Sequence, residues 1–285
     1  MKIAIQEAQA SLREGHHGFG AVIVKENGVI TRAHDTEETD ADPTAHAEMN
    51  AIRNACALLG KNLSSCTLVC THEPCPMCAA AIVWAQISRV AFGYDIADAI
   101  AQGRTRIEIS CEEVFQRANA GIAVERGVLK EECSILCDRE VRAEMKRLRG
   151  ASDDQLRAYD DERAAKRIAW FEKEHDTAPV GDLLDKAYSV LLRKLGIRED
   201  EAPVVRRDDR AIMFHSKNFC PTLEACQILG MDTRRVCRLS NDKSTNAVVR
   251  QVDRRLNFTR NYERIRPHSE YCEESISYRG DAGKA

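Results

Sequence analysis

The sequence has little of what marks membrane proteins or exported proteins. Its 285 residues contain no apolar run of the ~18 residues that a membrane-spanning helix needs. The first residues carry Lys2, Glu7, Arg13 and Glu14 and lack the apolar core of a signal peptide. We therefore expect a cytoplasmic protein that does not contact a membrane.

The chain also lacks a surplus of positive charge. Its 42 Lys and Arg residues stand against 45 Asp and Glu residues, a net charge of −3, so it has no global field that would attract nucleic acid. Its 12 cysteines, in a chain without a signal peptide, indicate metal binding or buried thiols rather than disulfides. The length of 285 residues suggests one large or two modest domains.

Hydrophobic patterning divides the chain into three regions. Residues 1–150 alternate strand-like and helix-like patterns, which predicts an α/β fold of three layers, α/β/α, around a mixed sheet. Residues 151–179 are strongly charged and predict a solvated helical linker, with disorder as the alternative. Residues 180–285 predict a second, smaller α+β domain of unknown role.

The individual elements follow from periodicity and from turn residues. In the first region we predict strands at 20–24, 28–31, 66–70, 89–94 and 125–129. We predict helices at 3–12, 45–59 and 76–86, a further helix that follows the last strand and ends at 149, and a polar loop at 34–43. In the last region we predict helices at 183–195, 221–239 and 244–255, and strands at 211–214 and 256–259.

Two short motifs carry the chemistry. Cys75 and Cys78 are three residues apart, so both sulfurs can lie on the first turn of one helix, where the helix dipole favours thiolates. His46 also opens a predicted helix, and two thiolates with one imidazole suit Zn²⁺ with a fourth position open to water. Glu48 can reach the same cavity and move a proton without binding the metal. We therefore predict one catalytic zinc per chain, with a structural or degenerate zinc site as the alternative.

Residues 18–94 resemble the cytidine-deaminase-like superfamily, in particular the branch of guanine deaminases, cytosine deaminases and tRNA adenosine deaminases. The resemblance does not rest on one motif alone, because four stretches carry it together. They are Phe19-Gly-Ala-Val-Ile-Val24, Asp42-Pro-Thr-Ala-His-Ala-Glu48, Glu73-Pro-Cys-Pro-Met-Cys78 and Ile87-Ser-Arg-Val-Ala-Phe-Gly93. The signature of a His-x-Glu followed by Pro-Cys-x-x-Cys is the one described for nucleobase deaminases in general.

The resemblance implies a deaminase fold over residues 1–149, often dimeric, in which His46, Cys75 and Cys78 bind zinc and Glu48 shuttles protons. It also implies that the backbone near Ala21 and the segment 71–74, which includes His72 and Glu73, contribute to the substrate pocket.

One departure from the family pattern concerns Asp35. The family usually has an Asn seven residues before the Asp of the Asp-Pro-Thr-Ala-His stretch, and that position is Asp35 here. An ionised Asp only accepts hydrogen bonds, so one hypothesis is that the substrate offers two donors there, as a guanidine-like ring edge would. The alternative is that the loop is displaced and Asp35 caps a turn.

Three further residues are candidates for substrate contacts. Trp84 resembles guanine deaminases more than tRNA deaminases at this helix, and it lines the pocket or packs in the core. His17 and His72 lie near the expected pocket mouth, where they contact substrate or are surface histidines.

We expect a hydrolytic deaminase of a small amino-substituted nitrogen heterocycle, such as a nucleobase or nucleoside, that activates water on zinc and releases ammonia. The acidic run from Glu37 to Asp42 near the expected entrance opposes RNA. The alternative is a tRNA adenosine deaminase, and a more distant alternative is a non-enzymatic zinc scaffold. A homodimer is the expected assembly.

The last region contains Cys220, Cys226, Cys237 and Cys272. They indicate buried thiols in an accessory domain, with a second metal site or a reactive cysteine as the alternative. The region faintly resembles thiazoline-carboxylate hydrolase-like domains, from which we carry over no function.

Overall fold

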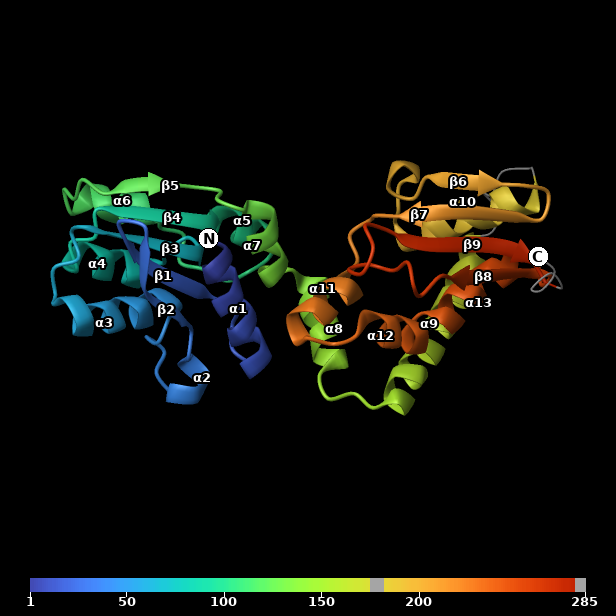
Figure 1. The fold of residues 1–285 in the computed structure, drawn as a ribbon, viewed down its shortest axis with the longest axis horizontal. Coiled ribbons are helices and arrows are strands. Elements are labelled where there is room, and N and C mark those ends of the chain that lie inside the picture. Colours follow the sequence, from blue (N-terminus) through green and yellow to red (C-terminus); the bar gives the residue numbers. More distant parts are fainter. Residues whose placement is uncertain (175–181, 280–285) are drawn as a thin grey trace. The chain divides into compact units, whose positions relative to one another are not determined.

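The computed structural model describes residues 1–174 and 182–279, and the chain divides into two compact units, residues 1–143 and 144–285 (Figure 1). The boundary falls inside a helix, α8 (Arg139–Leu148), rather than at the expected residue 150. Within the described part of the chain, no helix is long and apolar enough to cross a membrane.

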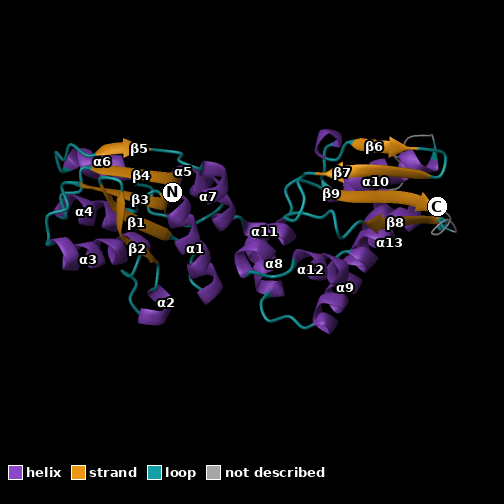
Figure 2. Ribbon diagram, in the orientation of Figure 1, coloured by secondary structure: helices purple, strands orange, loops and turns teal. Residues whose placement is uncertain are grey.

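The first unit is built on a five-stranded mixed sheet in the order β2-β1-β3-β4-β5 (Figure 2). Its strands are β1 (Gly20–Lys25), β2 (Gly28–His34), β3 (Cys66–His72), β4 (Arg89–Tyr94) and β5 (Ala123–Glu125). The strand β1 pairs antiparallel with both β2 and β3, whereas β3, β4 and β5 run parallel. The parallel strands end at one edge of the sheet, which places the segments that follow β3 and β4 side by side.

Helices cover both faces of this sheet. One face carries α1 (Lys2–Glu14), α5 (Ile96–Ala101) and α7 (Lys130–Cys137), and the other carries α3 (Ala47–Leu59), α4 (Pro76–Trp84) and α6 (Cys111–Arg117). The larger core lies on the second face, where Ile23 and Leu68 from the strands meet Ile52 and Ile82 from the helices. The predicted three-layer α/β/α fold is thus confirmed.

Two glycines let helices approach the sheet closely. A Cβ at Gly20 would collide with the backbone of Ala4 and Ala8 in α1, and a Cβ at Gly93 would collide with Cys133 in α7. These close approaches hold α1 against β1 and α7 against β4.

Some elements of the first unit differ from the predictions. The expected polar loop at 34–43 contains a short helix, α2 (Glu37–Asp40), whose acidic first turn suits a helix N-terminus. The strand expected at 125–129 ends at Glu125, because Gly127 and Leu129 adopt left-handed backbone conformations that turn the chain into α7. The helices α5 and α6 were not predicted.

The second unit has a four-stranded antiparallel sheet in the order β6-β7-β9-β8. Its strands are β6 (Val204–Arg207), β7 (Ala211–Ser216), β8 (Leu256–Arg260) and β9 (Cys272–Tyr278), and β6 and β9 were not predicted. Its helices are α9 (Asp153–Glu174), α10 (Leu183–Leu195), α11 (Pro221–Leu229), α12 (Thr233–Ser240) and α13 (Asp242–Val252), with a short 3₁₀ turn, η2 (Glu199–Glu201). The predicted α+β class of this region is confirmed.

The helix predicted at 221–239 is two helices. Gly230 adopts a left-handed conformation (φ 67°) that ends α11, and the Asp232 side chain accepts a hydrogen bond from the backbone N–H of Arg234 to begin α12. The spacing of apolar residues does not reveal where one helix ends and the next begins, because both helices bury apolar residues with a similar period.

The helix expected to be a solvated linker, α9, packs along α12 and α13 within the second unit. Its Asp160 is buried and accepts hydrogen bonds from the backbone N–H groups of Lys243 and Ser244 at the start of α13, at 2.8 and 3.0 Å. The linker interpretation overlooked that a charged helix can bury one narrow face. Residues 175–179 of the expected linker lie outside the described residues.

Candidate active site

Two helix N-termini of the first unit meet at the predicted metal ligands. His46 is the N-cap of α3 and Cys75 is the N-cap of α4, and Pro76 at the first helical position sets the backbone for α4 to begin there. Cys78 lies one turn further along α4 and is fully buried. The structure therefore brings together the three side chains that the spacing of the motifs indicated.

The geometry of these three side chains fits zinc. The Nδ1 atom of His46 lies 3.6 Å from the Cys75 sulfur and 3.5 Å from the Cys78 sulfur, and the three ligand atoms lie within 4.8 Å of one another. A tetrahedral centre with Zn–S bonds of about 2.3 Å and Zn–N bonds of about 2.0 Å has N···S edges of about 3.5 Å. Three protein ligands leave the fourth tetrahedral position open, as in catalytic zinc sites.

The second nitrogen of the His46 ring faces a carboxylate. Glu37, the first residue of α2, places Oε1 3.4 Å from His46 Nε2 and Oε2 3.7 Å from His17 Nε2. A histidine that binds metal usually donates its other ring N–H to such a group, which fixes the ring and its tautomer. Sequence reasoning treated Glu37 only as part of an acidic run, because nothing in its spacing from His46 signals the contact.

Electrostatics link the side chains of the cluster. A hydrogen bond with Cys75 raises the pKa of His46 to about 9, and a hydrogen bond from the Cys78 thiol, with help from His46, lowers the pKa of Cys75 to about 4. Burial raises the pKa of Glu48 to about 7. A metal ion that binds here must displace the proton of His46, so binding of the metal releases protons.

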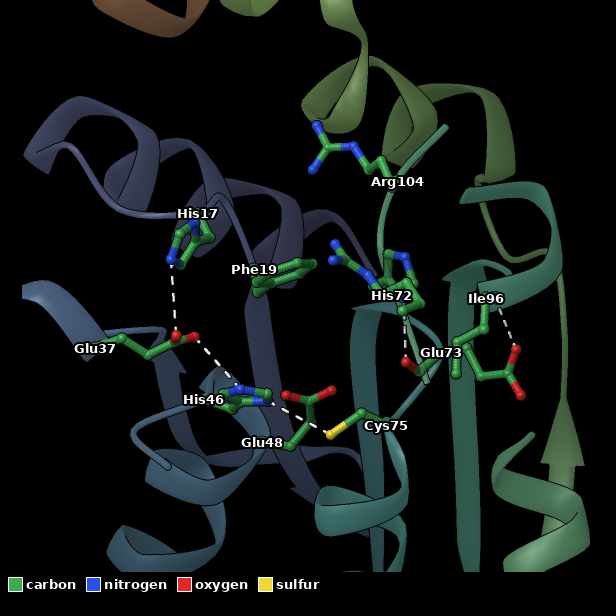
Figure 3. Close-up of a pocket in the computed structure, with 11 residues that line it drawn as sticks. His17, Phe19, Glu37, His46, Glu48, His72, Glu73, Cys75, Ile96 and Arg104 are labelled. Atoms are coloured by element: carbon green, nitrogen blue, oxygen red, sulfur yellow. Dashed lines mark hydrogen bonds and ion pairs between the residues drawn. The ribbon is translucent and has the colours of Figure 1, made fainter. Parts of the chain in front are cut away.

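These residues line one cavity of about 210 Å³ (Figure 3). It is smaller than the ~300–1,000 Å³ pockets that hold drug-sized ligands, so its size suits a single small ring system. Figure 3 shows Glu48 beside His46 and Cys75, with Glu37 on the far side of His46. The lining residues are His17, Phe19, Glu37, His46, Glu48, His72, Glu73, Cys75, Ile96, Arg104 and Arg106.

Four of the residues predicted from the sequence to take part in catalysis or substrate binding line this cavity: Glu48, His17, His72 and Glu73. Glu73, however, uses its carboxylate within the protein. Its two oxygens accept hydrogen bonds from the backbone N–H groups of Ile96 and Cys111, at 2.9 and 3.0 Å, which ties the starts of α5 and α6 to the site. Glu73 therefore shapes the cavity wall.

His72, at the end of β3, is buried with one ring nitrogen in use. Its Nδ1–H donates to the carbonyl oxygen of Glu73 at 3.1 Å, and its Nε2 is a buried atom without a hydrogen-bond partner in the protein. Burial lowers the pKa of His72 to about 4, so the ring is neutral and Nε2 is an acceptor. The rings of Phe19 and Tyr94 pack edge-on against it.

Asp35 does not line the cavity, which contradicts the hypothesis that it reads the substrate. It is fully buried, and its carboxylate accepts hydrogen bonds from the Ser11 hydroxyl and from the backbone N–H groups of His17 and Phe19, at 2.7, 2.7 and 2.8 Å. These three donors take three of the roughly four acceptor positions of the carboxylate, and Asp35 has no surface exposed to the cavity. Asp35 instead holds the loop whose residues His17 and Phe19 line the cavity, which is close to the alternative that it stabilises a turn.

Ala21 and Trp84 also lie away from the cavity. The backbone of Ala21 is paired on both sides within the sheet, with Ala33 and Cys70, and its side chain is in the core. Trp84 is the last residue of α4 and is 84% exposed, so it neither lines the pocket nor packs in the core. The prediction that Trp84 lies in a helix is confirmed, but its side chain faces solvent. The sequence does not show which face of α4 is buried, because the helix is apolar on all sides.

The cysteines of the second unit do not form a comparable cluster. Among the described residues, His46, Cys75 and Cys78 are the one set of three or more such ligands whose atoms converge within 4.8 Å. Burial raises the pKa of both Cys226 and Cys237 to about 12, as expected of thiols inside an apolar core.

Sequence reasoning missed five residues that line the cavity: Phe19, Glu37, Ile96, Arg104 and Arg106. Phe19 belongs to a stretch that carried the family resemblance and could have been proposed from it. Arg104 and Arg106 lie in the segment between α5 and α6, where no strand or helix pattern indicates what the side chains face.

Three side chains that could hold one metal ion, His46, Cys75 and Cys78, lie at the starts of two helices beside the buried Glu48. Such a site on a mixed α/β/α sheet is typical of a zinc-dependent deaminase domain. Residues 1–94 match the family described as the cytidine and deoxycytidylate deaminase zinc-binding region. The chain belongs to this family, and the expected zinc cofactor accords with it.

The relatives include enzymes with different substrates. The chain is 42% identical over 134 residues to the tRNA-specific adenosine deaminase of Bacillus subtilis (strain 168), a match that covers 47% of this chain and 81% of the relative. It is 43% identical over 105 residues to the guanine deaminase of the same organism, covering 36% of this chain and 67% of the relative.

Solved structures give similar matches. A tRNA:A34 deaminase studied for A-to-I editing is 32% identical, with a TM-score of 0.42, and the match covers 48% of this chain and 96% of that chain. The guanine deaminase structure from Bacillus subtilis is 43% identical, with a TM-score of 0.34, and the match covers 36% of this chain and 66% of that chain.

Proposed function

We propose that this protein is a hydrolytic deaminase of a small amino-substituted nitrogen heterocycle and that Glu48 is its proton-transfer residue. The observation that carries the proposal is the position of Glu48. It lies on the first turn of α3, two residues after His46, and it lines a cavity of about 210 Å³ together with His46 and Cys75. A buried carboxylate beside a three-ligand metal site is what hydrolytic deamination requires.

The residues of the cavity divide the work. Zinc, held by His46, Cys75 and Cys78, supplies the activation of a water molecule when it is bound. Glu48 would accept a proton from a water molecule whose oxygen bonds to the amino-bearing carbon, and it would deliver that proton to the amino group as the C–N bond breaks and ammonia leaves. His72 Nε2, a buried acceptor without a partner among the described residues, can accept a hydrogen bond from an N–H group of the ring.

The size and charge of the cavity favour a small substrate. Its rim carries the acidic α2, with Glu38 68% exposed in its side chain and Glu37 beside it, and this charge repels a polyanion. The similarity to the tRNA-specific adenosine deaminase of Bacillus subtilis favours tRNA adenosine as the second candidate. The homodimer and the cytoplasmic location expected from the sequence remain predictions.

Incubation of the zinc-loaded full chain with free bases, nucleosides, pterins, triazines and tRNA tests the proposal. Ammonia release measures deamination of the small compounds, and inosine in digested tRNA measures editing. We expect ammonia from at least one small heterocycle. Inosine formation in tRNA, with no ammonia from any small compound, would favour the second candidate.

A pair of variants tests the role of Glu48. We expect Glu48→Gln to lower turnover by about 10²- to 10⁴-fold while zinc stays at one per chain. Glu131→Gln removes an exposed carboxylate of α7 from the same unit and serves as the matched control. Absence of ammonia from all substrates, with zinc fully bound, would instead support the non-enzymatic zinc scaffold.

A further inference from the structure

Two arginines of the segment between α5 and α6 line the cavity without a carboxylate partner. Arg104 and Arg106 are both half-buried, and Arg106 lies over the ring of Phe19, 5.4 Å from its centre. In the part of the chain that the structure describes, no carboxylate lies within 4.0 Å of either guanidinium. In Figure 3, Arg104 and Glu37 lie on opposite sides of Phe19.

Their hydrogen bonds go only to backbone carbonyl groups. Arg104 donates to the carbonyl oxygen of Cys137 at 2.6 Å, and Arg106 donates to that of Thr105 at 2.8 Å. Each bond occupies one of the five N–H donors of a guanidinium, so several donors of each side chain remain for a ligand. A buried cationic group without a counter-charge is unfavourable, and proteins keep such groups where a ligand supplies the charge.

A third arginine adds to the positive charge of this wall. Arg142 of α8 donates hydrogen bonds to the carbonyl oxygens of Leu136 and His17, which links it to the cavity loop. Burial, followed by the charge of Arg104, lowers the pKa of both Arg106 and Arg142. Arg106 and Arg142 are thus cations that are both partly buried and close to the charge of Arg104, and an anion placed beside Arg104 and Arg106 would relieve the repulsion.

The acidic groups of the cavity are occupied elsewhere. Glu37 is held between His46 and His17, and Glu73 accepts two backbone N–H groups. Glu48 lies beside the metal ligands. One side of the cavity therefore carries the proposed zinc ligands and Glu48, and another side carries the two arginines. A ligand that binds to both sides would have an amino-substituted ring at one end and an anionic group at the other.

We propose that Arg104 and Arg106 form an anion-binding subsite and that the substrate is a small heterocycle carrying a phosphate or a carboxylate. The inference rests on the proposed deaminase function and specifies its substrate class. Planar guanidinium groups bind phosphate and carboxylate oxygens in pairs of hydrogen bonds, so two of them hold such a group in a defined orientation. The anion would then fix the ring with its amino carbon toward the metal.

Matched substrates test this inference directly. Nucleosides are compared with their 5′-monophosphates, and pterin with pterin-6-carboxylate, in the zinc-loaded full chain. We expect kcat/KM to be about 10- to 100-fold higher for the anionic member of the productive pair. The two series distinguish a phosphate from a carboxylate as the source of the charge.

Substitution of the arginines tests which residues recognise the anion. In Arg104→Gln and Arg106→Gln we expect the ratio of kcat/KM for the anionic and neutral members to fall by about tenfold or more. Arg117→Gln is the matched control, because Arg117 of α6 is 78% exposed and pairs with Glu113. Addition of salt should weaken the preference in the parent chain and leave it nearly unchanged in the Arg106 variant.

A binding measurement separates failure of this inference from failure of the proposed function. Calorimetry with zinc-loaded Glu48→Gln protein compares the same pairs without turnover. Tighter binding of the anionic member, lost in the Arg104 and Arg106 variants, supports the subsite even when no substrate is deaminated. Equal binding of both members, or a preference unaffected by both arginine substitutions, overturns it. Inosine formation in tRNA, with no preference among small anions, also overturns it.

Discussion

Both units bury polar side chains and cysteines, but they use them differently. In the first unit, His46, Cys75 and Cys78 converge within 4.8 Å at the starts of two helices. Among the described residues of the second unit, no three such ligands converge in this way, and the buried carboxylate of Glu274 pairs with Arg260 at 2.6 Å. A count of cysteines therefore does not identify a metal site, whereas their spacing along one helical turn does.

The largest expected effect contrasts the cysteines of the two units. In Cys75→Ser we expect loss of stoichiometric zinc and of all deaminase activity, because a serine hydroxyl does not replace a thiolate ligand. In Cys237→Ser we expect one zinc per chain as in the parent, because Cys237 is a buried thiol outside any cluster of ligands within the described residues. Elemental analysis of the purified chains measures both. Loss of zinc in the Cys237 variant would show that the second unit binds metal.

The next contrast concerns two buried carboxylates. Glu274 accepts hydrogen bonds from Arg260 at 2.6 and 2.8 Å and from Ser216 at 2.5 Å, so Glu274→Gln leaves the buried guanidinium of Arg260 with Asp242, 3.8 Å away, as its remaining carboxylate partner. We expect it to lower the free energy of unfolding by about 3 kcal/mol and to leave kcat unchanged. In Glu48→Gln we expect the opposite pattern, a large loss of kcat with little loss of stability. Denaturant unfolding and ammonia release, measured on both variants, decide the contrast.

His72 predicts a dependence of the stability of the first unit on pH. Its pKa is about 4 in the folded protein and 6.5 in the unfolded chain, so between these values the unfolded chain binds more protons. Stability therefore falls as pH falls from 6.5 to 4, by up to about 3 kcal/mol for this group. We expect His72→Gln to remove that part of the decline. Unfolding free energies measured for both chains across this range test it, and parallel curves would refute it.

The smallest effect concerns two aspartates that hold backbone N–H groups. Asp35 fixes the loop at His17 and Phe19, and Asp160 fixes the start of α13. We expect Asp35→Asn and Asp160→Asn each to lower stability by about 1–3 kcal/mol, because an amide leaves one buried donor unsatisfied. KM should change only in the Asp35 variant, since its loop lines the cavity. A change of KM in the Asp160 variant would contradict this assignment.

The sequence predicted the first unit and the convergence of His46, Cys75 and Cys78 well because both depend on local patterns. His46, Cys75 and Cys78 lie where a helix begins, and Pro76 and the apolar spacing of α3 mark those beginnings. Strands with continuous apolar runs, such as β3 and β4, were also placed correctly. Each of these features is decided by residues near one another in the chain.

The remaining features depend on contacts between distant segments. Asp35 was assigned to the substrate because the family usually has an Asn at this position. In the folded chain, three donors from another segment hydrogen-bond to its carboxylate. Arg104 and Arg106 lie in a segment without periodicity, and only the folded chain shows that they line the cavity. The strand β9 was missed because its alternating pattern is mostly polar, and its place in the sheet comes from pairing with β7 and β8.

The two oxygens of Glu37 lie 3.4 Å from the ring of His46, a proposed zinc ligand, and 3.7 Å from the ring of His17 at the rim of the cavity. Through Glu37, a compound that binds at the rim and moves His17 can change the hydrogen bonding of His46, and with it the environment of a metal ion bound there. If cobalt(II) replaces zinc, its visible absorption bands should shift when a compound displaces His17, even if that compound never reaches the metal. The metal then becomes an optical reporter of rim occupancy, and Glu37→Gln should weaken that signal.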